Sequence, residues 1–194
     1  MVDRETLHFE TAAEWEAWLD ENHATSTGVI LKIAKKGSAF ASVTYVEALD
    51  VALMYGWIDA RRNALDDDFF LQNYTPRVKR SPWSIVNQGK VAALIEAGRM
   101  QPAGQAEIDR AKADGRWDAA YAGPATITES AEFAQALAAN PAAAEFYAKL
   151  SSQNRFAILF RLHNAKRAET RERNIMKFIE QLERGETIYP QKRS

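Results

Sequence analysis

The sequence predicts an α+β protein with a small, mainly antiparallel N-terminal sheet, helices on one face of that sheet, and a helical C-terminal half. Before residue 77, several short segments either alternate apolar and polar residues or are rich in β-branched residues, as strands do. From residue 81 onward, apolar residues recur at helical spacing, and Gly or Pro separates the segments. Strands therefore come first and helices follow, which is the order of an α+β fold.

Two helices of the N-terminal part are predicted from capping boxes, in which a Thr and a Glu three residues later satisfy each other's backbone N–H groups. Thr11 with Glu14 begins the first helix, and Thr44 with Glu47 begins the second. Gly56 is the expected C-terminal stop of the second helix. The elements predicted before residue 57 are strands at 7–9 and 28–34 and helices at about 12–22 and 44–55.

A β-hairpin is predicted from WIDARR at 57–62 and FFLQNYT at 69–75. The turn-prone NALDDD joins the two strands, and Pro76 ends the second one. Its three consecutive Asp residues point in different directions, so we interpret them as turn residues rather than a cation site. Alternation places Trp57, Asp59 and Arg61 on one face of the first strand, and Phe70, Gln72 and Tyr74 on one face of the second.

The helical half is expected to begin at Ser81, with Ser81 as N-cap and Pro82 at the first helical position. That helix runs to Ala97 and stops at Gly98. Asn154 is the expected cap of a later helix. The predicted division is 1–97 for the α+β part and 98–194 for the helical part, within one compact unit that shares a core. The other predicted helices span about 102–114, 130–139, 142–149 and 165–184.

Composition and motifs exclude several chemistries. The chain has 194 residues and 46% hydrophobic residues, enough for a core, and it has no Cys. Disulfides, thiolate zinc sites and cysteine nucleophiles are therefore excluded. The three His residues are far apart in sequence, and no cofactor-binding or nucleophile motif is present. We predict no metal, no cofactor and no identifiable catalytic residues.

The charge distribution is uneven along the chain. Residues 1–70 carry 6 basic and 13 acidic groups, net −7, and residues 155–194 carry 10 and 5, net +5. One interpretation is a set of solvated faces, and the other is a basic C-terminal part that faces an anionic ligand or an acidic partner. The overall net charge of −1 argues against nucleic-acid binding. The acidic N-terminus and the lack of a long apolar run predict a cytoplasmic protein without a membrane span.

Residues 55–87 combine aromatic and charged side chains in the way that ligand pockets require. Arg77 precedes a predicted helix N-terminus. Its guanidinium can form two parallel hydrogen bonds with a carboxylate or phosphate, and the free N–H groups of the helix N-terminus also favour an anion. The competing interpretation is a basic loop, with the tryptophans in the core. The pocket hypothesis requires that Trp57, Arg77 and Trp83 lie close together and are not wholly buried. Its candidate ligand-binding residues are Trp57, Asp59, Gln72, Tyr74, Arg77, Trp83 and Asn87, closed by Lys166 and Arg167.

Four strings carry a family resemblance: YGWIDARR, FLQNYTPRVKRSPWSIVN, GRMQPAGQAEIDRAKADGRWDAAY and AKRAETRERNIMKFIEQLERGE. Together they resemble the bacterial YdeI/OmpD-associated family, also labelled bacteriocin-protection or OmdA-like, over about residues 45–187. Ala60, Arg61 and Arg62 depart from the family's usual GWIDG or GWIDS. The resemblance implies a link to porins and to antimicrobial-peptide resistance. It transfers no catalytic residue, and the periplasmic location sometimes attached to the family is not carried over.

Three functions are weighed. The favoured one is a non-enzymatic binding or adaptor protein in stress or envelope resistance, with a pocket for a small anionic or polar ligand or a surface for a protein partner. The alternative is a small-molecule enzyme that uses a cleft around Asp59, Arg77 and Trp83, with Asp59 as a general base if burial raises its pKa. Nucleic-acid binding through the basic C-terminal part ranks last. The ligand and the oligomeric state do not follow from the sequence.

Overall fold

The computed structural model describes residues 4–123 and 126–191. It divides into two compact units, residues 1–120 and 121–194, and each has its own cluster of buried apolar side chains. The boundary differs from the predicted one after residue 97, because the helix Pro102–Ala113 packs against the helix Tyr45–Met54 within the first unit.

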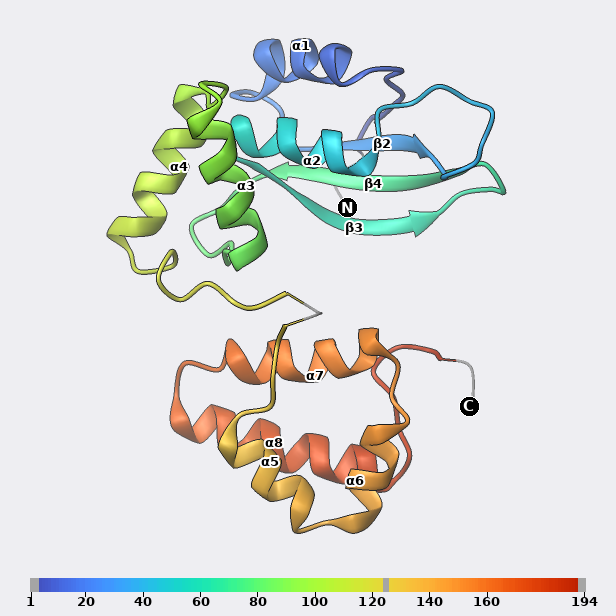
Figure 1. Ribbon diagram of the computed structural model, residues 1–194, viewed down its shortest axis with the longest axis vertical. Helices are drawn as coiled ribbons and strands as arrows, with labels where there is room; N and C mark the ends of the chain where they lie inside the picture. Colours follow the sequence, from blue (N-terminus) through green and yellow to red (C-terminus); the bar gives the residue numbers. More distant parts are fainter. Residues whose placement is uncertain (1–3, 124–125, 192–194) are drawn as a thin grey trace. The chain divides into compact units, whose positions relative to one another are not determined.

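In its described part, residues 4–120, the first unit combines a four-stranded sheet with four helices, arranged as in Figure 1. α1 and α2 lie on one side of the sheet, and α3 and α4 lie at one of its ends. The α+β class, with strands first and helices after, is confirmed. The elements are β1 (Thr6–Leu7), α1 (Ala12–Asn22), β2 (Val29–Ala34), α2 (Tyr45–Met54), β3 (Trp57–Ala64), β4 (Phe69–Pro76), α3 (Ile85–Glu96) and α4 (Pro102–Ala113).

The strand order in the sheet is β1-β2-β4-β3. β1 pairs in parallel with β2, whereas β2 with β4 and β3 with β4 pair antiparallel, so the sheet is mainly antiparallel as predicted. The ladder between β3 and β4 is irregular between Asp59 and Arg62. A β-bulge of this kind leaves backbone groups without their ladder partners.

One face of the sheet forms the core of the first unit. Along β2 the odd residues Val29, Leu31 and Ile33 are buried, and they stand opposite Tyr74, Gln72 and Phe70 of β4. Because side chains alternate between the two faces of a sheet, Tyr74, Gln72 and Phe70 of β4 face the same core. Trp15 of α1 is fully buried there and donates from Nε1 to the carbonyl of Ala48, 3.1 Å away, which ties α1 to α2.

The predicted caps of α1 and α2 are confirmed, but the predicted start of α3 is wrong. Ser84, not Ser81, is the N-cap of α3, and its Oγ accepts from the N–H of Asn87 at 3.1 Å. Ser81 instead accepts from the N–H of Val78 and closes the preceding turn. Trp83 therefore precedes the helix and does not share a helix face with Asn87.

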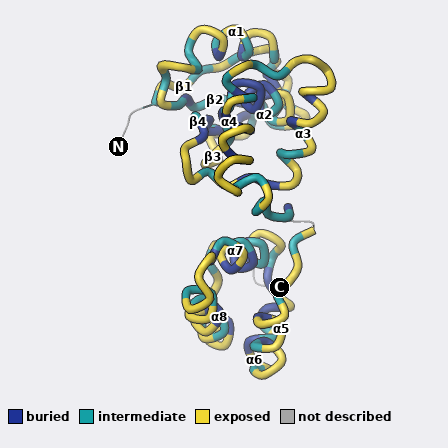
Figure 2. Tube along the Cα trace, turned by 90° about the vertical axis from the view of Figure 1, so that its left-hand side faces the viewer, coloured by how far each residue is buried: buried dark blue, intermediate teal, exposed yellow. Residues whose placement is uncertain are grey.

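The second unit is helical, and its buried residues lie on the inner sides of its helices (Figure 2). The predicted cap of the third of these helices is wrong, because Ser151 caps it and Asn154 lies within its first turn. The elements are α5 (Ala131–Ala138), α6 (Pro141–Ala148), α7 (Ser152–His163) and α8 (Ala168–Glu183).

Candidate ligand-binding site

The residues predicted to form a pocket around the hairpin take structural roles instead. Gln72 and Asn73 are buried in β4, at the irregularity of the β3–β4 ladder. Gln72 Nε2 donates to the carbonyl of Ala60 at 3.0 Å, and Asn73 Nδ2 donates to that of Arg61 at 2.9 Å. The two side-chain amides thus replace the ladder hydrogen bonds that the bulge removes.

Asp59 and Tyr74 stand opposite each other on the core side of the sheet. The carboxylate of Asp59 accepts from the hydroxyl of Tyr45 at 2.9 Å, which joins β3 to α2. Tyr74 is fully buried, and burial together with the nearby charge of Asp59 raises the pKa of its phenol above the ordinary range. Tyr74 is therefore a neutral phenol at physiological pH.

Arg77 and Trp83 stack on each other inside the first unit. The guanidinium carbon of Arg77 lies 3.8 Å from the Trp83 ring centroid, and Arg77 Nη1 donates to the carbonyl of Pro82 at 3.0 Å. Trp57, Arg77 and Trp83 expose only 1%, 5% and 2% of their surface. The pocket hypothesis requires these three side chains to be accessible to a ligand. In this structure they pack in the interior.

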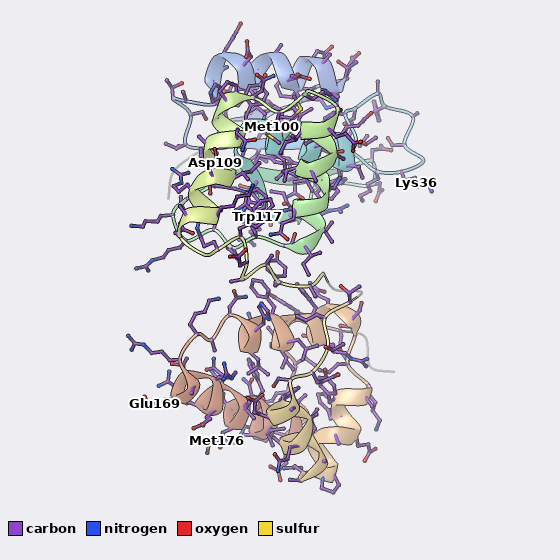
Figure 3. The ribbon with its side chains drawn as sticks, turned by 60° about the vertical axis from the view of Figure 1, so that its left-hand side comes forward. Lys36, Met100, Asp109, Trp117, Glu169 and Met176 are labelled. Carbon is purple, nitrogen blue, oxygen red and sulfur yellow. The ribbon has the colours of Figure 1, made fainter. Side chains whose placement is uncertain are left out.

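Figure 3 shows Trp117 between α3 and α4, where it extends this aromatic stack. The Trp83 and Trp117 ring centroids are 4.9 Å apart, and Gln88 Nε2 donates to the Trp117 carbonyl at 2.7 Å. Asn87, the remaining candidate on α3, is half-buried and takes part in the cap through its backbone N–H. Arg77, Trp83 and Trp117 thus fix the loop before α3 to the end of α4.

Lys166 and Arg167 belong to the second unit, in the turn between α7 and α8, and both are exposed. Arg167 is the N-cap residue of α8 and makes no side-chain cap hydrogen bond. The sequence grouped both cations with the hairpin residues, and that grouping remains a prediction.

A cleft of about 620 Å³ lies in the second unit between α7, α8 and the segment that follows α8. This volume is in the range of small-molecule sites. The eleven described residues that line it include two cations, three amides and two hydroxyls, but no Asp or Glu. Its lining residues are Phe160, Arg161, Asn164, Ala165, Thr170, Asn174, Lys177, Phe178, Gln181, Thr187 and Ile188.

The polar side of the cleft comes from one face of α8 and the end of α7. Thr170, Asn174, Lys177 and Gln181 follow one another at spacings of four, three and four residues, so they share a helix face. Arg161 of α7 is exposed, and its Nη1 donates to the carbonyl of Ala157 at 2.8 Å, which orients the guanidinium along its own helix. Two cations and several hydrogen-bond donors thus line one cleft.

The sequence reasoning missed these residues. The sequence does contain a sign of this site: the helix face formed by Thr170, Asn174, Lys177 and Gln181 carries no acidic residue. Elsewhere the same helix holds Glu169, Glu172, Glu180 and Glu183. A helix face that carries amides and a cation but no carboxylate is one that an anion can approach without charge repulsion.

Residues 7–107 match the family model described as "Domain of unknown function (DUF8412)", which covers more than half of the chain. The chain belongs to this DUF8412 family. Residues 126–185 match a second model, described as "Bacteriocin-protection, YdeI or OmpD-Associated" (OmdA). The family resemblance drawn from the sequence is thereby confirmed over 126–185. A search of curated proteins and a search of solved structures found no significant match.

The two matches follow the two units of the fold. The DUF8412 match lies within the first unit and includes the hairpin, whereas the OmdA match lies within the second unit and includes most of the cleft. The OmdA match covers the C-terminal part of the range, about 45–187, over which the sequence resembles this family. Among the described residues of both units, no helix is long and apolar enough to cross a membrane.

Proposed function

We propose that this DUF8412–OmdA protein is a non-enzymatic binding protein that takes a small anionic or polar ligand in the cleft of its second unit. The observation that carries the proposal is the lining of that cleft, which combines Arg161 and Lys177 with amide and hydroxyl groups and, among its described residues, no carboxylate. A guanidinium forms bidentate hydrogen bonds with a carboxylate or phosphate, and an ammonium adds a positive charge.

The charge of the second unit supports the same ligand class. Residues 121–194 carry 11 basic and 8 acidic groups, net +3, whereas residues 1–120 carry 14 and 18, net −4. A positive surface raises the local concentration of small anions and speeds their association. We propose that the ligand is bound in a stress- or envelope-resistance role, in keeping with the words "Bacteriocin-protection" in the description of the matched family.

The enzyme alternative has less support. The enzyme hypothesis places its cleft around Asp59, Arg77 and Trp83. Arg77 and Trp83 are instead buried against each other, and Asp59 accepts a hydrogen bond from Tyr45. Contacts of this kind stabilise the first unit. They leave the second-unit cleft as the better-supported place for a ligand.

An adaptor function is the second candidate, and a groove on the first unit favours it. The groove of about 560 Å³ lies between α2 and α3, and its α3 side carries Gly89, Ala93 and Ala97 at intervals of four residues. Val86, also in its lining, is 54% exposed. Small residues at this spacing leave room for the close approach of a partner helix.

Ligand binding is tested by titrating the full-length protein with inorganic phosphate, succinate and citrate, followed by thermal unfolding and by the side-chain amide NMR signals of Asn164, Asn174 and Gln181. A ligand at about 100 times its Kd is expected to stabilise the unit that binds it by about 2.7 kcal/mol. Arg161→Gln and Lys177→Gln should each weaken binding. Arg173→Gln, an exposed cation of α8 outside the cleft lining, is the matched control.

Unchanged amide signals for these three anions, and also for carboxylates and phosphates that carry an alkyl or aryl group, would contradict the proposal. The adaptor candidate is then examined with the cysteine-free chain, by placing a thiol-linked photocrosslinker at Ala93→Cys in the groove and at Ala24→Cys outside it. A specific protein cross-link from the first position alone would favour the adaptor. Equal labelling from both positions would count against it.

A further inference from the structure

The cleft of the second unit has an apolar side as well as a polar one. Phe160 of α7, Phe178 of α8 and Ile188 of the following segment line it together with Ala165. We infer that its ligand is an anion that carries an apolar group, such as an alkyl or aryl carboxylate or phosphate, rather than a small inorganic anion. This inference rests on the proposed function and adds the class of the ligand.

The apolar side is continuous with the hydrophobic core of the unit. Phe178 is a buried member of that core, and Ile188 packs against it. Phe160 is held by Tyr121, with ring centroids 4.7 Å apart in an edge-to-face arrangement, and by Phe156 at 5.6 Å. Aromatic side chains fixed in this way present a preformed surface, so a ligand does not have to order them on binding.

The wall formed by Thr187 and Ile188 is also held in place. Asn154 of α7 is 1% exposed, and it bonds both backbone groups of Tyr189. The Tyr189 N–H donates to Asn154 Oδ1 at 2.8 Å, and Asn154 Nδ2 donates to the Tyr189 carbonyl at 3.0 Å. Gln191 Oε1 accepts from the same Nδ2 at 2.9 Å and from the Ser151 N–H at 2.9 Å.

Charge and apolar surface together favour an amphiphilic anion. A small inorganic anion uses the cations Arg161 and Lys177 but leaves the apolar wall in water, so it gains nothing from Phe160 or Ile188. An attached alkyl or aryl group buries that wall, and each fully buried methylene strengthens binding about fourfold. The cleft is open, so partial burial should give a smaller factor, about twofold per methylene.

The test is an NMR titration of the full chain with acetate, butyrate, hexanoate and octanoate, and with inorganic phosphate against phenyl phosphate. The side-chain amides of Asn164, Asn174 and Gln181 report occupancy of the cleft. Affinity should rise about twofold for each added methylene, and phenyl phosphate should bind about tenfold more tightly than inorganic phosphate.

Two variants separate the polar and apolar parts. Ile188→Ser should reduce the gain in affinity per methylene, and weaken octanoate binding more than acetate binding, because it removes apolar wall but no charge. Lys177→Gln should weaken every member of the series by a similar factor. Met176→Ser is the control, since Met176 is 65% exposed on α8, outside the cleft lining (Figure 3).

The possible outcomes distinguish failure of this inference from failure of the proposed function. Binding of acetate and phosphate without any gain from apolar groups would overturn this inference and leave the proposed function standing. Failure of every anion to shift the three amides would overturn both. Binding to vesicles of anionic phospholipid, with no response to monomeric octanoate or phenyl phosphate, would identify a lipid surface and also overturn the small-ligand inference.

Discussion

Glu107 of α4 and Arg116 form an ion pair inside the first unit, with 2.9 Å between Glu107 Oε1 and Arg116 Nη1. The Glu107 side chain is only 2% exposed, and its other carboxylate oxygen pairs with Arg110. Arg116 Nη1 also donates to the carbonyl of Ser81 at 3.1 Å, so the pair connects α4 to the loop that leads into α3. The stability of this region therefore depends on one buried carboxylate.

Glu107→Ala is expected to destabilise the first unit by about 2–3 kcal/mol, because the largely buried Arg116 loses one of its two carboxylate partners and keeps only Asp114. All five Trp residues lie in the first unit, so urea unfolding followed by Trp fluorescence reports on this unit alone. Asp109→Ala is the matched control on an exposed face of α4, labelled in Figure 3, and it should change stability by less than about 0.5 kcal/mol. Equal effects of the two changes would contradict the role assigned to Glu107.

Two helical glycines of the first unit should respond to alanine in opposite directions. A Cβ on Gly104 would lie 2.1 Å from the carbonyl oxygen of Met54, so α2 and α4 can pack this closely only without a side chain there. A Cβ on Gly89 of α3 meets no atom within 4 Å. Gly104→Ala should cost at least about 2 kcal/mol, through the forced separation of two packed helices.

Gly89→Ala serves as the paired variant. It should stabilise the first unit by about 0.5–1 kcal/mol, because alanine loses less conformational entropy than glycine in a helix interior. Urea midpoints by Trp fluorescence compare the two proteins directly. A gain in stability for Gly104→Ala would show that the helices can separate freely, contrary to the close packing described.

Asn154 should control the order of the segment after α8. Asn154→Ala removes the partners of the Tyr189 N–H and carbonyl, and we expect a loss of about 2–3 kcal/mol in the local stability of this segment. Hydrogen exchange at the Tyr189 amide measures the effect, with Gln153→Ala, an exposed neighbour, as control. Because Thr187 and Ile188 line the cleft, ligand affinity should fall as well. Unchanged protection of the Tyr189 amide from hydrogen exchange would show that Asn154 does not hold this segment in place.

The hydrogen bond between Tyr147 and Glu129 should appear as a pH dependence. Tyr147 Oη donates to Glu129 Oε1 at 2.7 Å, and this bond lowers the pKa of Glu129 below its usual value of 4.5. A pKa that is lower in the folded than in the unfolded protein gives stability above the unfolded pKa, and this stability is lost as the pH falls through the folded pKa.

Tyr147→Phe should therefore cost about 0.5–1 kcal/mol at pH 7, a modest figure because Glu129 is exposed, and almost nothing at pH 3. Carboxyl NMR should show the pKa of Glu129 rising toward 4.5 in the variant. Tyr189→Phe is the control, since Tyr189 makes its contacts to Asn154 through its backbone. A cost that is equal at both pH values would mean that the loss is one of packing.

The local signals of the sequence predicted much of the fold. Thr11 and Thr44 cap α1 and α2 as predicted, and the hairpin strands lie where alternation placed them. The start of α3 was missed because Ser81 and Ser84 are both competent caps, and local propensity does not choose between them. Packing of Trp83 against Arg77 and Trp117 keeps residues before Ser84 out of the helix.

The sequence by itself determined the α+β class, the capped helices and the family resemblance, because these depend on periodicity, capping residues and short strings that are read along the chain. Only the tertiary structure decided which polar residues face solvent. Arg77 and Gln72 look like ligand contacts in sequence, yet they satisfy groups of their own core, whereas Arg161 and Lys177 meet at one cleft only because α7 and α8 pack side by side. Burial and convergence are properties of packing between distant segments, and a linear pattern does not contain them.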